Sequence, residues 1–144
     1  MNFRGQAILR ASFEKLGTLG LSKATSVLLT GETHAGTAAI LNADTIGGVL
    51  RSIAPNLKTY KVLPADPSHP RFDSMFAQSM PGLTTLWMDA ALRSLAELAN
   101  VSGALAPDCL AHNTSDPARC MYFDAAIDHV QTPVFVVQQM PGVW

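Results

Sequence analysis

The residues best placed to do chemistry lie in one short stretch, from Ser26 to Ala39. The stretch begins as an apolar run that predicts a buried strand, turns through Gly and small polar residues, and continues with helical spacing. A strand, a tight turn and a helix in that order present the side chain at the turn to solvent. That side chain is Thr33, whose hydroxyl, if activated by a base, attacks a carbonyl carbon.

This turn resembles the nucleophile elbow of α/β-hydrolases, whose usual sequence is G-x-S-x-G. Here the five positions read Gly31-Glu32-Thr33-His34-Ala35, so Thr replaces the Ser and Ala the second Gly. The two flanking positions need small residues because the strand and helix backbones pass close together, and Gly31 and Ala35 meet that need. A β-branched residue such as Thr33 is strained if the turn requires a positive φ.

Composition limits the function classes. The chain has 144 residues, the length of one domain, and is 48% hydrophobic and 15% charged, which predicts a sizeable core. The net charge is −1 and the ten Lys and Arg are scattered, so we expect no nucleic-acid partner. No apolar run approaches the roughly 20 residues of a membrane span. The first residues show no signal-peptide pattern.

The elements expected to position the turn alternate along the chain. Periodicity predicts helices over 5–19, 35–53 and 83–99, with a weakening at Gly47-Gly48. Short apolar runs predict strands over 25–30, 59–63 and 133–137, the second closed by Pro64. The segments 65–81 and 101–121 are expected to be irregular.

Short apolar strands alternating with helices are typical of parallel βαβ units. The predicted fold class is therefore α/β, a partial α/β-hydrolase fold in which about three parallel strands carry helices on both faces. We expect residues 1–144 to form a single such domain. Two of three strands would be edges, and an open edge is an aggregation hazard, so the chain is expected to be truncated or part of a larger fold.

The two cysteines allow two interpretations. A bridge between Cys109 and Cys120 would close a loop of about 12 residues and stabilise the fold by about 2–3 kcal/mol. Two free thiols in a reducing compartment are equally compatible with the residues alone. Two glycosylation sequons, at Asn100 and Asn113, lie in the same region and favour an oxidising, secretory environment.

Three segments together resemble the pectin acetylesterase/Notum family. The turn and the following Asn42-Ala43-Asp44 are similar to that family's elbow and its N-x-D. The segment Lys61-Val62-Leu63-Pro64-Ala65-Asp66 is similar to its next strand. The two cysteines with Asp116-Pro117 and Thr132-Pro133 resemble its L-P-x-x-C, D-P-x-x-C and T-P-L-F pattern, which also pairs the cysteines.

The resemblance implies a mostly secreted carboxylesterase with a Ser-Asp-His triad and no cofactor, acting on an acylated polysaccharide or protein. Thr33 stands at the nucleophile position, and the backbone N–H of His34 is one oxyanion donor. Gly36 completes the elbow. Gly142 stands where the family has its Asp, and the family's His and second oxyanion donor have no counterpart in this sequence.

The remaining histidines offer little to replace the triad. His34 adjoins Thr33 but diverges from it on a tight turn, and Glu32 is expected to be solvated. His69 is near Asp66 in a Pro-rich loop, where a solvated ring is the favoured interpretation. His112 and His129 are expected at the surface. The spacing of cysteines and histidines fits no structural zinc pattern, so we expect no metal site.

Three hypotheses follow. The chain is part of a true esterase, or a catalytically silent homologue, as Thr33 and Gly142 together suggest. Alternatively it is an interaction module in an assembly, with a protein partner covering the open sheet edges. For any of them, we expect residues 1–144 alone to hydrolyse esters very poorly.

Overall fold

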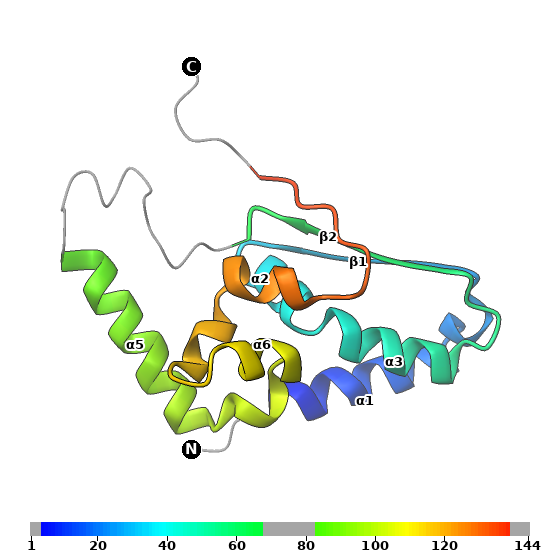
Figure 1. Cartoon of the computed structure of the whole chain (residues 1–144). Coiled ribbons are helices and arrows are strands. Elements are labelled where there is room, and N and C mark those ends of the chain that lie inside the picture. Colours follow the sequence, from blue (N-terminus) through cyan, green and yellow to red (C-terminus); the bar gives the residue numbers. More distant parts are fainter. Residues whose placement is uncertain (1–3, 68–82, 139–144) are drawn as a thin grey trace.

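A computed structural model describes residues 4–67 and 83–138. Three helices and two strands come first, in the order α1 (Gly5–Thr18), β1 (Ser26–Glu32), α2 (His34–Leu41), α3 (Ala43–Ile53) and β2 (Thr59–Ala65). Helices follow: α5 (Leu83–Ala99), α6 (Pro107–His112) and α7 (Phe123–Ala126) (Figure 1). Short 3-10 helices η1 to η4 span Leu21–Lys23, Val101–Ala104, Pro117–Met121 and Ile127–His129. None of the described helices is long and apolar enough to cross a membrane.

The sheet is parallel, as predicted. β1 pairs with β2 in a register that sets Ser26 against Thr59 and Glu32 against Ala65. The segment 133–137 lies on the other side of β2 through two parallel bridges, Val62 to Val134 and Ala65 to Val137. The three predicted strands therefore run in one direction with the elbow strand at one side.

Pro64 explains why residues 133–137 pair with β2 through two separate bridges and not through a continuous ladder. It was expected to close the second strand but instead lies inside β2, fully buried. On either side of it the ladder is regular: Phe135 N–H donates to Val62 O at 2.9 Å, and Val137 N–H donates to Pro64 O at 3.0 Å. Proline has no N–H, so it cannot donate the bond that would join the two bridges.

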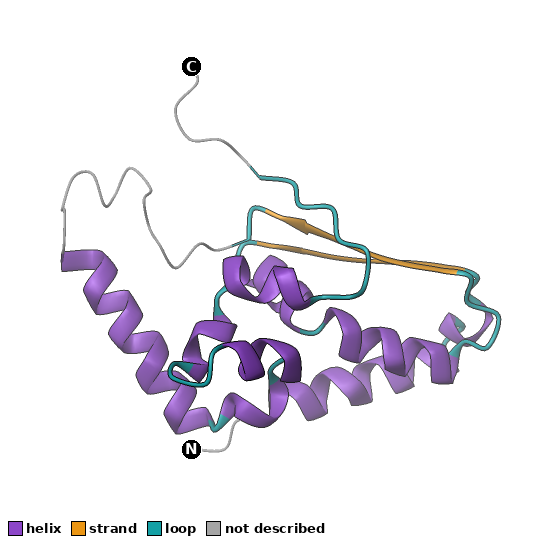
Figure 2. Ribbon diagram, in the orientation of Figure 1, coloured by secondary structure: helices purple, strands orange, loops and turns teal. Residues whose placement is uncertain are grey.

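The described helices gather on one side of the sheet rather than on both faces (Figures 1 and 2). α2 and α3 cover the side that carries Leu29, Tyr60 and Val62, and Ala39 and Ala43 pack directly against them. On the other side Leu28 is 57% and Phe135 is 70% exposed. Among the described residues, one face of the sheet is thus buried and the other is open.

The predicted helix over 35–53 is two helices. The break falls at Asn42, whose side-chain amide and backbone N–H both donate to Ala38 O, at 2.9 and 3.1 Å. α3 runs without a break through Gly47-Gly48, where a weakening was expected, and Gly47 serves packing. A Cβ there would lie 3.0 Å from the ring of Tyr60, whose hydroxyl donates to Ala43 O.

The apolar stripes of the first and third predicted helices are less buried than expected. α1 has no buried residue, and its Ile8 and Leu16 are 65% and 45% exposed. In α5, Ala96 is buried but Leu98 is 74% exposed. Helical periodicity located both helices correctly, yet within the described residues little packs against their apolar sides.

The segment expected to be irregular, 101–121, contains α6 and two 3-10 helices. The disulfide between Cys109 in α6 and Cys120 in η3 joins them, with 5.9 Å between Cα atoms. Both half-cystines are buried and pack with Leu105. A second small core, formed by Ile40, Phe123 and Ala126, connects α7, just after this segment, to α2.

Candidate functional site

The turn after β1 places Thr33 at the carboxyl edge of the sheet. Thr33 has φ 51° and ψ −118°, a conformation that L-residues with a branched Cβ rarely adopt. It is held there from both sides, because its N–H donates to Ala65 O at 3.0 Å and its C=O accepts from Thr37 N–H at 3.1 Å. The side chain is exposed, so the strain presents a hydroxyl to solvent at the start of α2.

Close backbone approach explains the small residues around Thr33. A Cβ on Gly31 would lie 2.3 Å from the carbonyl oxygen of Ala35, which leaves no room for any other residue. At Gly36 a Cβ would lie 3.0 Å from Ala65 O and 3.1 Å from Gly31 O. The strand, the turn and the helix therefore meet with backbone against backbone, the geometry of a sharp strand-to-helix turn.

The surroundings of Thr33 are poor in proton acceptors. No side chain in the described ranges 4–67 and 83–138 hydrogen-bonds its hydroxyl. Glu32 and His34 are both exposed, and Asp66, at φ 45°, directly follows β2. Gly142, at the acid position, and His69 lie outside the described residues.

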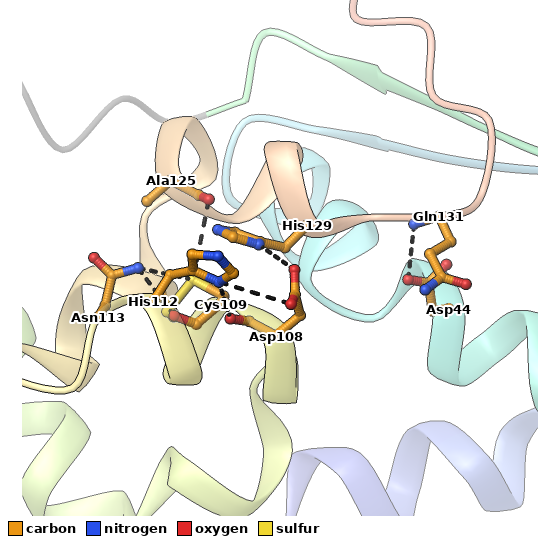
Figure 3. Close-up of polar contacts among 9 residues, drawn as sticks. Asp44, Asp108, Cys109, His112, Asn113, Ala125, His129 and Gln131 are labelled. Carbon is orange, nitrogen blue, oxygen red and sulfur yellow. Dashed lines mark hydrogen bonds and ion pairs between the residues drawn. A yellow bond between two sulfur atoms is a disulfide. The ribbon is translucent and has the colours of Figure 1, made fainter.

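A second polar contact fixes the third strand to the helix layer. The Asp44 carboxylate accepts a hydrogen bond from the N–H of Gln131 at 3.0 Å (Figure 3). It also accepts from the Thr132 N–H at 2.8 Å and from the Thr132 hydroxyl at 2.6 Å. Burial acts to raise the pKa of Asp44, but these hydrogen bonds and the Arg51 charge together lower it. Asp44 and Thr132 belong to motifs that the sequence singled out, and the structure brings them together.

A third group of polar side chains lies in the segment 107–129, which contains the Cys109–Cys120 bond and is called the disulfide-linked segment below. Asp108 and His112 come from α6 and His129 from η4, and one ligand atom of each lies within 4.8 Å of the others (Figure 3). His129 Nδ1 is 2.6 Å from the Asp108 carboxylate, and His112 Nδ1 is 2.8 Å from the Asp108 carbonyl oxygen. The hydrogen bond with His129 and the two imidazoles lower the pKa of Asp108, against a smaller effect of burial. His112 is exposed as expected, but only 16% of the His129 side chain is.

The two sequon asparagines differ in their surroundings. Asn100 is exposed and has a left-handed backbone. Asn113 is partly buried, and its side-chain amide donates to Cys109 O at 3.0 Å. Of the two, Asn100 presents its side chain more openly.

Sequence reasoning missed two features of these sites. The first is the Asp44–Thr132 contact, between residues 88 apart in sequence, for which the only signal was that both lie in family-like motifs. The second is the grouping of Asp108 with the two histidines. The i, i+4 spacing of Asp108 and His112 on a helix was a usable signal, but the approach of His129 depends on the tertiary fold.

The profile of the Pectinacetylesterase family matches residues 1–144, so the chain belongs to that family. It is 25% identical over 142 residues to pectin acetylesterase 4 and 26% identical over 143 residues to pectin acetylesterase 5, both from Arabidopsis thaliana. Each alignment covers 99% of this chain but only 32% and 30% of those proteins. The chain thus spans about a third of the length of the curated relatives it matches.

The fold is similar to that of two crystal forms of the Wnt deacylase Notum from Drosophila. Both superpose with a TM-score of 0.68 and 23% identity, covering 94% and 95% of this chain and 38% of the Notum chain. This similarity of fold confirms the expected fold class, a partial α/β-hydrolase sheet.

Proposed function

We propose that this chain carries the nucleophile-elbow segment of a carboxylic-ester hydrolase acting on acetylated polysaccharide. The observation that carries the proposal is the strained, exposed Thr33 between β1 and α2. It lies at the carboxyl end of a parallel strand, where open α/β sheets bind their ligands. The names of the pectin acetylesterase relatives support an acetyl ester as the group removed.

In this proposal the Thr33 hydroxyl occupies the position of the attacking oxygen. The backbone N–H of His34, the first residue of α2, is one donor for the oxyanion that forms on the ester. The first N–H groups of a helix have no acceptor within the helix, so the turn offers them without displacing another bond. Gly31, Ala35 and Gly36 allow the approach that aims these groups outward.

We expect residues 1–144 alone to hydrolyse esters slowly. A hydroxyl without a positioned base is a poor nucleophile, and no such base contacts Thr33 within the described residues. Loss of triad members typically costs about 10⁴- to 10⁶-fold in turnover. The second candidate function, a non-catalytic module, is favoured by this observation and by the open sheet face with Leu28 and Phe135.

The Cys109–Cys120 disulfide supports an oxidising location for the chain, consistent with a secretory pathway. Glycosylation is then proposed at Asn100, with Asn113 less accessible.

Binding of acetylated pectin oligomers tests the proposal separately from turnover. Backbone NMR resonances of Thr33, His34 and Asp66 are expected to shift with acetylated oligogalacturonide and not with the same oligomer after saponification. Equal shifts with both ligands, or shifts confined to residues far from the turn, would argue for a module without an esterase-type site.

A further inference from the structure

We propose that Asp108, His112 and His129 form a Zn²⁺-binding site, with one ligand atom from each side chain. The site lies on the disulfide-linked segment and is independent of the elbow. Each of the three side chains offers one ligand atom within 4.8 Å of the others. Imidazole nitrogens with a carboxylate are a ligand set that suits zinc.

Asp108 lies at the centre of the group. Its carboxylate is 2.6 Å from His129 Nδ1 and 3.7 Å from His112 Nδ1. Both imidazoles therefore already approach the same carboxylate, and a bound ion would take the place of these contacts. Three protein ligands leave the fourth position of a tetrahedral zinc ion to water.

The disulfide holds the two halves of the site in place. Asp108 is the residue before Cys109, which is fully buried and bonded to Cys120, also buried. His129 is largely covered, and it lies close to His112, with 5.1 Å between ring centroids and 39° between ring planes (Figure 3). Little of the fold has to move for an ion to bridge α6 and η4.

Zinc binding requires the ligand atoms to move closer together, and two of the three side chains have room to move. Two ligands about 2.1 Å from one ion stand at most about 4.2 Å apart, so the group has to contract slightly. Asp108 and His112 have side chains that are 65% and 66% exposed, and rotation of either costs little packing. The negative charge of Asp108 attracts the ion, and the two imidazoles complete the protein ligands.

Zinc titration of the disulfide-intact chain tests the site. Isothermal calorimetry with ZnCl₂ is expected to give one site per chain, and bound zinc is expected to raise Tm because it links α6 to η4. His112→Gln and His129→Gln are each expected to weaken zinc affinity by more than about tenfold. Asp108→Asn is expected to weaken it by more than about tenfold, because it replaces a charged carboxylate ligand with a neutral amide.

The matched control is His34→Gln, which removes an exposed histidine outside the group and is expected to leave zinc affinity unchanged. Circular dichroism and a mass measurement of the intact disulfide show that each variant is folded. Equal zinc affinity in His112→Gln, His129→Gln and His34→Gln would overturn the proposal. So would the absence of saturable binding to the wild-type chain at millimolar zinc.

Discussion

The elbow and the disulfide-linked segment are held together by opposite means. Around Thr33, backbone groups contact backbone groups, and the exposed side chain at the turn contributes nothing visible to the fold. In the segment from Asp108 to His129, side chains make the connections: a disulfide, an imidazole–carboxylate contact and the bidentate Arg119–Asp124 pair at 3.0 and 2.6 Å. A turn fixed by its backbone tolerates a changed nucleophile, whereas a segment fixed by side chains depends on their identity.

The largest expected effect is at the closest backbone approach. Gly31→Ala is expected to destabilise the chain by about 3 kcal/mol or more, because a Cβ 2.3 Å from Ala35 O meets backbone that cannot yield. Gly48 in α3 is the matched control, since nothing lies within 4 Å of its Cβ position. Gly48→Ala is expected to stabilise by about 0.5–1 kcal/mol. Urea unfolding measures both. Similar changes in stability for the two variants would show that close backbone approach does not exclude a side chain at Gly31.

The disulfide is expected to contribute next. Replacing Cys109 and Cys120 together by Ala is expected to lower the free energy of unfolding by about 2–3 kcal/mol, from the loop it closes in the unfolded chain. Reducing the wild-type chain should cause a loss of the same order, while reductant should not affect the double variant. An unchanged urea midpoint on reduction would mean that the ion pairs alone hold the segment.

Asp44 joins α3 to the start of the third strand, and this contact predicts an acid dependence of stability. Its pKa is lowered in the folded chain, so its contribution is present above the unfolded pKa of about 4 and is lost as pH falls through the folded pKa. Asp44→Asn is expected to cost about 1 kcal/mol at pH 7 and to reduce the loss of stability in acid. Asp128→Asn, at an exposed carboxylate, is the control. Parallel pH–stability curves for wild type and Asp44→Asn would contradict this role.

The smallest expected effect is a gain in stability when the strained Thr33 is replaced. Thr33→Gly is expected to stabilise the chain by about 1 kcal/mol because it relieves the strain at φ 51°. Ala38→Gly, at an exposed position of α2, is expected to destabilise by about the same amount. Thermal or urea unfolding should therefore give shifts of opposite direction. A loss of stability in Thr33→Gly would show that its side chain supports the turn.

The strands and helices were predictable because each carries a local signal. Periodicity located α1 and α5, and three apolar runs located the parallel sheet. The break at Asn42 was missed because one amide side chain competes for Ala38 O, an effect that hydrophobic spacing does not register. Pro64 was misplaced because a strand tolerates proline wherever one missing N–H can be spared.

The elbow was predictable as a position and the group around His129 was not. Gly31, Thr33 and Ala35 fall within five consecutive positions, and their spacing alone implied the turn that β1 and α2 form. His129 meets Asp108 across 21 residues, through a fold that the disulfide and two small cores determine. Helix exposure was also misjudged, since an amphipathic pattern predicts a face to bury but not what covers it.

Ester turnover with and without the Thr33 hydroxyl tests the account most directly. The measurement is p-nitrophenyl acetate hydrolysis by the 144-residue chain and by Thr33→Ala, both checked for folding. The account predicts equal rates, set by slow background attack from exposed histidines, because no base is positioned at Thr33 within the described residues. A clear drop in the Thr33→Ala variant would contradict it and show that this altered elbow still performs nucleophilic catalysis.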